Sequence, residues 1–101
     1  MAETGLSGRH VVPVKLRGGA IDAGVAYLRT GQGTGLGSPV VLIHGVGMNA
    51  DVWAPQMDAL SRHHDVIAMD MPGHGASDLP PEDAGLADYY DAVIGLMDAL
   101  G

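Results

Sequence analysis

The spacing of apolar and polar residues predicts an antiparallel hairpin at the start of this chain. In His10–Leu16, one set of positions (Val12, Val14 and Leu16) alternates with another (Val11, Pro13 and Lys15), which is typical of a strand, and Ile21–Arg29 is interpreted as a second strand. Between them, Arg-Gly-Gly-Ala at residues 17–20 is a turn signal. Pro13 removes one backbone donor, which favours a place at the edge of a sheet for the first strand.

Two continuous apolar runs, Val40–Ile43 and Val66–Met69, predict strands of a different kind. Runs without alternation are typical of strands buried on both faces of a parallel sheet. A helix is predicted between them over residues 52–61, with Asn49 or Asp51 as its N-cap. The apolar face of this helix is expected to consist of Trp53, Met57 and Leu60.

A loop at residues 79–83 leads into the last predicted helix, which is expected to end near Gly101. Gly95 is expected to weaken this helix by about 1 kcal/mol relative to Ala. The buried stripe predicted from spacings of three and four consists of Leu86, Tyr90, Val93, Met97 and Leu100. The solvent-facing side is expected to carry Asp88, Asp91 and Asp98. The resulting order, strand-strand-strand-helix-strand-helix, predicts an α/β fold with a mostly parallel sheet after the hairpin.

The 101 residues leave room for one domain, which we place at residues 9–101 after a flexible lead-in at residues 1–8. The segment 30–39 is rich in glycine, but it is not typical of a dinucleotide-binding loop. Its glycines stand at every second position and a strand follows, whereas that fingerprint lies between a strand and a helix. A flexible connector is the better interpretation.

The composition argues against several kinds of partner. A net charge of −7 with only five Lys and Arg disfavours nucleic acids and anionic membrane surfaces, because both are bound through cationic side chains. The absence of Cys excludes disulfides, thiolate metal sites and a Cys nucleophile. The first residues lack the features of a secretory signal, and no apolar stretch is long enough to span a membrane, so we expect a cytoplasmic protein.

Histidines are the remaining candidates for a metal site. His63 and His64 are neighbours on an extended segment, where adjacent side chains point to opposite faces, and His74 lies in another loop. They lack the helical spacing of metal ligands, so we expect neither a metal nor a cofactor.

Two motifs follow the two apolar strands. The first is His44-Gly45-Val46-Gly47-Met48-Asn49 and the second is Asp70-Met71-Pro72-Gly73-His74-Gly75-Ala76-Ser77. The order of apolar strand, His-Gly-x-Gly, Trp, apolar strand and Asp-x-x-Gly-x-Gly-x-Ser resembles the N-terminal part of the α/β-hydrolase fold, most closely its esterase and enol-lactonase members. Carbon–carbon bond hydrolases and acyltransferases of the same family remain open.

The resemblance implies a serine-type hydrolase of a small ester, lactone or related carbonyl substrate. It also implies a strand order of 1-2-4-3, with strand 2 antiparallel to the others. In this family a backbone N–H of the loop after strand 3 helps to stabilise the oxyanion, and the position that matches is Val46. Gly45, Gly47 and Met48 are expected to line the substrate site. His44 is expected to brace the loop rather than to act as the catalytic base.

The second motif is expected to be structural, with roles in shaping the loop for Asp70, Gly73, Gly75 and Ser77. Ser77 is not expected to be the nucleophile, because it lacks the Gly-x-Ser-x-Gly context and the strand-turn-helix elbow. That pattern occurs nowhere in the chain. The nucleophile (Ser or Asp), the acid and the base are therefore expected outside these residues.

We accordingly expect the N-terminal portion of a longer enzyme, inactive without the remainder of its fold. The strand at 40–43 would then present an apolar edge. The alternative is a complete but catalytically inactive binding or interaction module, or a degenerate gene product.

Overall fold

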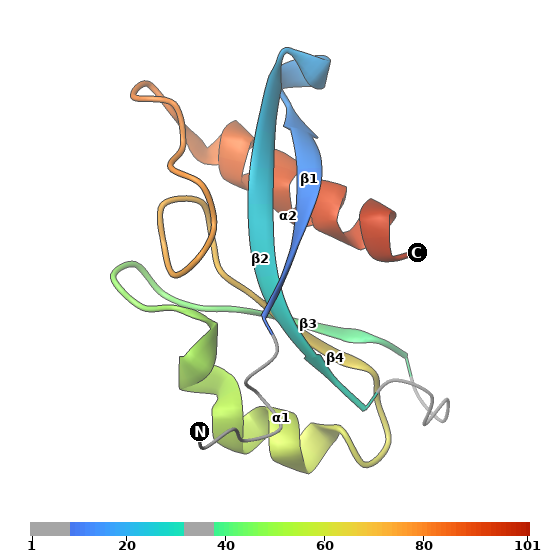
Figure 1. The fold of residues 1–101 in the computed structure, drawn as a ribbon. Helices are drawn as coiled ribbons and strands as arrows, with labels where there is room; N and C mark the ends of the chain where they lie inside the picture. Colours follow the sequence, from blue (N-terminus) through green and yellow to red (C-terminus); the bar gives the residue numbers. More distant parts are fainter. Residues whose placement is uncertain (1–8, 32–37) are drawn as a thin grey trace.

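A computed structural model describes residues 9–31 and 38–101. The predicted lead-in at residues 1–8 and most of the glycine-rich connector lie outside the described residues. Figure 1 shows the elements, which in chain order are β1 (His10–Leu16), the 3₁₀ turn η1 (Arg17–Gly19), β2 (Ile21–Thr30), β3 (Val40–Ile43), the 3₁₀ turn η2 (Ala50–Trp53), α1 (Ala54–Leu60), β4 (Val66–Met69) and α2 (Leu86–Leu100). The predicted order of strands and helices is confirmed.

The four strands form one sheet in the order β1-β2-β4-β3. β2 is antiparallel to both β1 and β4, whereas β3 and β4 are parallel, with Val40 opposite Val66. This is the order and the direction that the resemblance implies, and Pro13 lies on the edge strand β1 as expected. Because β3 and β4 run in the same direction, the loops that follow them emerge at the same edge of the sheet. In open α/β sheets this edge is where ligands bind.

The sheet separates two cores, one beneath each α-helix, and Figure 1 shows α2 crossing behind β1 and β2 and α1 well apart from it at the bottom of the view. Alternate residues of a strand point to opposite faces, so β2 and β4 contribute to both cores. The core on the α1 face contains Leu28, Ala50, Met57, Val66 and Ala68, with Trp53 and Leu60 packed against it. The core on the α2 face contains Val14, Leu16, Ala23, Val25, Tyr27, Ile67, Met69, Ala92 and Leu96. The predicted apolar face of α1 is thus confirmed.

The first helix begins differently from the prediction. The Asn49 side chain accepts a hydrogen bond from the Asp51 N–H at 2.9 Å, and the chain turns helical at Ala50 as a 3₁₀ turn. The α-helix itself spans Ala54–Leu60, shorter than the predicted 52–61, with Pro55 in its first turn. An early cap combined with a proline therefore divides the predicted helix into two pieces.

The prediction that both apolar runs are buried on both faces is correct for β4 and wrong for β3. All four residues of β4 are buried, whereas β3 is half-buried and Ile43 is 45% exposed. β4 has a strand on each side, but β3 pairs with β4 alone. Burial of an apolar strand depends on its neighbours, and β3 is the apolar edge that the resemblance led us to expect.

The predicted buried stripe of α2 is correct for Val93 and Leu100, which pack against the core, and wrong for Leu86, Tyr90 and Met97, which are exposed. The helix buries Asp88, Ala92 and Leu96, which lie four residues apart, and leaves Leu86 and Tyr90 exposed. Small residues allow this face to approach the sheet closely. A Cβ atom on Gly95 would lie only 2.9 Å from the Val14 Cβ atom of β1. Gly95 therefore serves the contact between helix and strand, besides weakening the helix.

Asp88 was expected in solvent, but it is buried and paired. Its carboxylate accepts hydrogen bonds from the Arg17 guanidinium at 2.9 and 3.1 Å and from the Gly85 N–H at 3.0 Å. These bonds, with Arg17 contributing most, hold the pKa of Asp88 below its ordinary value. A buried carboxylate is acceptable in a fold when it is paired in this way.

Candidate functional site

The loop after β3 is a tight turn that faces solvent. The Met48 N–H donates to the Gly45 carbonyl at 3.1 Å, and Gly47 has a φ of +83° at the third position of the turn. This combination is typical of a type II β-turn, whose third position requires a positive φ and favours glycine. A Cβ atom on Gly47 would meet nothing within 4 Å, so conformation and not crowding accounts for this glycine.

Val46 lies at the tip of this turn and is 95% exposed. Its backbone N–H has no hydrogen-bond acceptor among the described residues. The next N–H, that of Gly47, donates to Nε2 of His74 at 3.1 Å. Of these two consecutive amides, only Val46 therefore retains a free donor.

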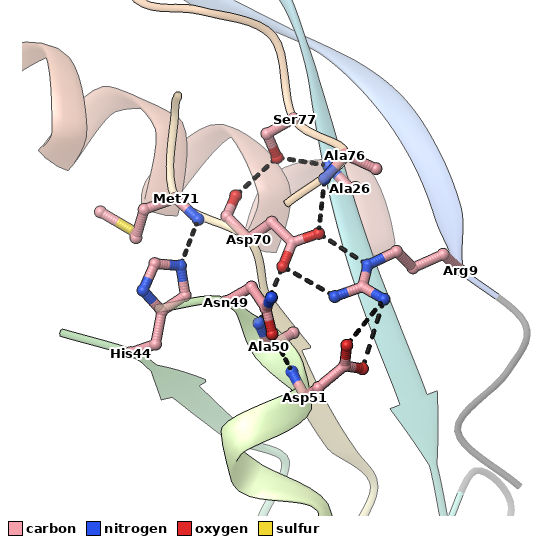
Figure 2. Close-up of polar contacts among 10 residues, drawn as sticks. All are labelled: Arg9, Ala26, His44, Asn49, Ala50, Asp51, Asp70, Met71, Ala76 and Ser77. Atoms are coloured by element: carbon pink, nitrogen blue, oxygen red, sulfur yellow. Dashed lines mark hydrogen bonds and ion pairs between the residues drawn. The ribbon is translucent and has the colours of Figure 1, made fainter. Parts of the chain in front are cut away.

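The loop after β4 is built around the fully buried carboxylate of Asp70, drawn in Figure 2. Arg9 donates to it through Nε at 2.7 Å and through a second guanidinium nitrogen at 3.1 Å. The N–H groups of Ala50 and Ala76 donate to it at 2.8 and 3.0 Å. The carboxylate thus links the N-terminal segment, the turn before α1 and its own loop.

The charge of Asp70 is well compensated. Burial alone raises the pKa of this carboxyl, but the hydrogen bonds from Arg9 and from the Ala50 and Ala76 amides outweigh it, so its pKa lies below the ordinary value. Gly75 lies directly against this group: a Cβ atom there would be 2.3 Å from the carboxylate, and its φ is +52°. No larger residue fits there without moving Asp70.

The Ser77 hydroxyl both donates and accepts a hydrogen bond, and both partners are backbone groups. It donates to the Asp70 carbonyl at 2.6 Å and accepts from the Ala26 N–H of β2 at 2.8 Å (Figure 2). A nucleophilic serine needs a base to take its proton, and here a backbone carbonyl holds that proton. The geometry gives Ser77 the role of fastening the loop to β2.

His44 connects the two loops and is buried. Its Nδ1 lies 2.7 Å from the Gly45 carbonyl, and its Nε2 accepts the Met71 N–H at 3.0 Å (Figure 2). A carbonyl only accepts and an amide only donates, so Nδ1 carries the proton and Nε2 does not. Because both ring nitrogens are engaged with backbone, His44 has no free nitrogen to act as a base.

A hollow of about 320 Å³ lies beside these loops. Its walls come from the loop after β3, the loop after β4 and the first turn of α2. They consist of His44, Gly45, Val46, Met71, His74, Leu86 and Tyr89. Mostly apolar walls with a few polar groups at the C-terminal edge of a parallel strand pair are typical of a site for a small molecule.

The structure brings together only part of the predicted site. Gly45 and Val46 line the hollow, whereas Gly47 and Met48 are exposed but lie outside its lining. Met71, His74, Leu86 and Tyr89 were not predicted to line it. The position of both loops at one edge of a parallel pair was the signal that could have pointed to His74.

A second hollow of about 270 Å³ lies elsewhere, between the β3–β4 pair and the C-terminal half of α2. The charged groups in its wall are Arg29 and Asp65, which bind each other at 2.9 and 2.6 Å. It offers no free reactive group among the residues that line it, so we place the candidate site at the loops.

Two further properties concern only the parts of the chain that the structure describes. Within residues 9–31 and 38–101, no three His, Cys, Asp or Glu side chains are grouped so that they could hold a metal ion. Over the same ranges, no helix has both the length and the apolar character that crossing a membrane requires.

Residues 38–101 match the model of the alpha/beta hydrolase fold family. Among curated proteins, the (E)-2-((N-methylformamido)methylene)succinate hydrolase of Acinetobacter baylyi is 53% identical over 60 residues, which are 59% of this chain and 23% of that protein. The chain spans about a quarter of the length of the curated relatives it matches.

Solved structures show the same relationship. A thermophilic esterase from Thermogutta terrifontis superposes with a TM-score of 0.78 and 28% identity, over 91% of this chain and 32% of that one. The enol-lactonase from Burkholderia xenovorans superposes with a TM-score of 0.70 and 30% identity, over 88% of this chain and 33% of the lactonase.

Proposed function

The chain belongs to the α/β-hydrolase fold family, and we propose that it forms the N-terminal part of a serine-type hydrolase of an ester, lactone or related carbonyl. The observation that carries this proposal is the free N–H of Val46 at the wall of the hollow. An unpaired backbone donor beside an apolar hollow is what an oxyanion hole requires.

In the proposed reaction a serine outside these residues attacks the substrate carbonyl. The carbonyl oxygen then gains negative charge, and donors that are already in place stabilise it. Val46 supplies one such donor, and the amide after the nucleophile supplies the second. A histidine base takes the serine proton and passes it to the leaving group, which departs from the acyl-serine, and water then hydrolyses the acyl-serine to release the acid and restore the serine. His44 is not that base, because backbone groups occupy both of its nitrogens.

The walls of the hollow favour a small substrate with an apolar portion. Val46, Met71 and Leu86 offer apolar surface, and a volume of about 320 Å³ suits a small molecule. The esterase and the enol-lactonase support an ester or lactone substrate, since their names describe hydrolysis of that kind, and the Acinetobacter baylyi relative is likewise a hydrolase.

A chimera tests the proposal. This whole chain would replace the corresponding N-terminal part of the Acinetobacter baylyi hydrolase, whose remainder then supplies the rest of the fold. We expect the chimera to hydrolyse the substrate of that enzyme, because the loop with the Val46 donor would complete its oxyanion hole. The parent hydrolase serves as the positive control, and circular dichroism verifies that the chimera folds.

A folded chimera without activity would contradict the proposal. It would favour the other hypothesis, in which the chain is a catalytically inactive module that binds and does not react. The 101-residue chain alone, assayed with a chromogenic short-chain ester, is expected to show no turnover, since its sequence contains no Gly-x-Ser-x-Gly motif to supply a nucleophile.

A further inference from the structure

We infer that His74 is a positioning residue, which holds the Gly47 amide in place and thereby keeps the Val46 N–H as the donor of the site. This role rests on the proposed donor function of Val46. Sequence patterns alone do not indicate it, because His74 lies 27 residues from Gly47 in a different loop.

The contacts of His74 define its tautomer. Its Nδ1 lies 3.1 Å from the Pro72 carbonyl, which is an acceptor only, so Nδ1 carries the proton. Its Nε2 is then an acceptor and receives the Gly47 N–H at 3.1 Å. His74 is therefore a neutral imidazole with both nitrogens bound to backbone groups.

His44 forms an equivalent bond between the two loops, but the loop that supplies the histidine and the loop that supplies the N–H are exchanged. It comes from the loop after β3 and accepts the Met71 N–H of the loop after β4. His74 comes from the loop after β4 and accepts the Gly47 N–H of the loop after β3. The centroids of the two rings are 4.9 Å apart. We call this arrangement the histidine cross-brace, and it ties the two loops together at two points.

The cross-brace acts on the peptide unit that decides the type of the turn. Type I and type II turns differ by rotation of the peptide that joins the second and third residues, here Val46 and Gly47. That peptide contains the Val46 carbonyl and the Gly47 N–H. Because glycine adopts positive and negative φ readily, nothing intrinsic to Gly47 prevents the rotation. The bond to His74 does, since rotation would remove the Gly47 N–H from Nε2.

Loss of this bond should therefore disorder the turn that carries the Val46 donor, without removing any group that contacts the substrate carbonyl. Misplacement of a catalytic group by about 1 Å can lower a rate roughly 100-fold. Binding through the apolar walls would change little. The signature of His74 is thus a loss in kcat that exceeds the change in KM caused by its place in the wall of the hollow.

Nuclear magnetic resonance of the ¹⁵N-labelled 101-residue chain tests the geometry directly. A long-range ¹H–¹⁵N spectrum of the imidazoles reports which nitrogen holds the proton. We expect the proton of His74 on Nδ1, and a coupling through the hydrogen bond from the Gly47 amide to Nε2. A proton on Nε2 would overturn the inference, because a protonated Nε2 cannot accept the Gly47 N–H.

Two variants of the chimera test the effect on catalysis. In His74→Gln the side-chain oxygen can reach the former position of Nε2 and still accept the Gly47 N–H. In His74→Asn the shorter side chain reaches only the position of Nδ1. We expect kcat to fall roughly 10- to 100-fold in His74→Asn and clearly less in His74→Gln, whose side-chain oxygen restores the acceptor for the Gly47 N–H. His63→Asn, on an exposed histidine, is the matched control.

The outcomes separate the two proposals. If Val46→Pro lowers kcat and His74→Asn does not, the role of His74 is wrong and the proposed function stands. If Val46→Pro leaves kcat unchanged, the proposed function is wrong, and the positioning role of His74 in that function is wrong as well. Equal losses in His74→Asn and His74→Gln would also overturn the positioning role, since rescue by an acceptor at the Nε2 position is its specific consequence.

Discussion

The two glycine-containing loops at the C-terminal ends of β3 and β4 have opposite construction. In the loop after β3, Gly47 stands in open space, Val46 is exposed and its N–H is free. In the loop after β4, Gly75 is pressed against a buried carboxylate, and Asp70 accepts four hydrogen bonds. The loop after β3 presents a donor to solvent, and the loop after β4 is held by the hydrogen bonds of Asp70 and Ser77.

The difference shows how a small exposed turn obtains a defined geometry. The loop after β3 makes few contacts of its own, so its rigidity depends on the loop beside it through the histidine cross-brace. In the loop after β3 glycine allows a positive φ, whereas in the loop after β4 it also leaves room for the buried Asp70 carboxylate. Substitutions in the two loops should therefore separate stability from activity.

The largest effect on stability is expected from Asp70→Ala. It leaves the Arg9 guanidinium and the amides of Ala50 and Ala76 without their acceptor. Removal of one partner of a buried ion pair lowers the free energy of unfolding by about 3–5 kcal/mol. Urea unfolding of the 101-residue chain followed by circular dichroism measures this loss.

Asp51→Ala is the matched control, because Asp51 binds the same arginine from an exposed position at 3.3 Å. Exposed ion pairs contribute only about 0–1 kcal/mol. Equal losses in the two variants would contradict the central place of Asp70 in the loop after β4.

The two glycines should respond differently to the same substitution. Gly75→Ala combines a positive φ with a Cβ atom 2.3 Å from the Asp70 carboxylate. Strain of the backbone and overpacking together should lower the free energy of unfolding by about 2–4 kcal/mol. In Gly47→Ala the new Cβ atom meets no other atom. Only the strain of the positive φ then lowers the free energy of unfolding, by about 1–2 kcal/mol. A larger loss in Gly47→Ala, measured by thermal or urea unfolding, would reverse the comparison between the loops.

Acid should lower the free energy of unfolding by protonating Asp70, the buried carboxylate of the loop after β4. Its pKa is lower in the folded chain than in the unfolded one, so the folded state binds fewer protons. This contribution to stability is present above the ordinary aspartate pKa of about 3.9 and is lost as the pH falls through the lower folded value. The pKa values of Asp83 and Asp88 are lowered as well, with the same sign.

Urea unfolding at a series of pH values below about 5 measures this dependence. In Asp70→Asn the group no longer titrates, so stability should fall less steeply with acid than in the unchanged chain. Identical slopes for the two chains would show that Asp70 does not contribute to the dependence on pH.

The smallest effect on stability is expected from Val46→Ala. This side chain is 95% exposed, and exposed substitutions usually change the free energy of unfolding by less than about 0.5 kcal/mol. A loss above about 1 kcal/mol, measured in the same urea experiment, would mean that the turn packs against the fold more than its exposure indicates.

Local patterns predicted the strands, their succession along the chain and both motif loops, because alternation, apolar runs and glycine or proline signals act over a few residues. The order of the strands within the sheet came from the family resemblance. The face of α2 was not predictable in this way. Asp88 is buried because Arg17, 71 residues away, pairs with it. Leu86 is apolar but 86% exposed, since it lines the hollow and not the core.

The candidate site also divides into features that short patterns predict and features that depend on contacts between distant residues. The position of Val46 came from a short motif and from a family resemblance. The contacts of Gly47 with His74 and of Met71 with His44 each join residues 27 apart, and only the pairing of β3 with β4 brings them together. Sequence spacing carries no signal for such bonds unless the neighbouring ends of the two strands are considered jointly.

Val46→Pro in the chimera tests the central claim most directly, because proline removes the backbone N–H that is proposed to bind the oxyanion. Val46 is the second residue of a type II turn, where proline is favoured, so the turn should persist. We predict that kcat falls by about 100- to 1000-fold with the fold unchanged, as expected for loss of one oxyanion donor. Val46→Ala, which keeps the N–H, should stay close to the unchanged chimera. A folded Val46→Pro variant with undiminished kcat would contradict the account.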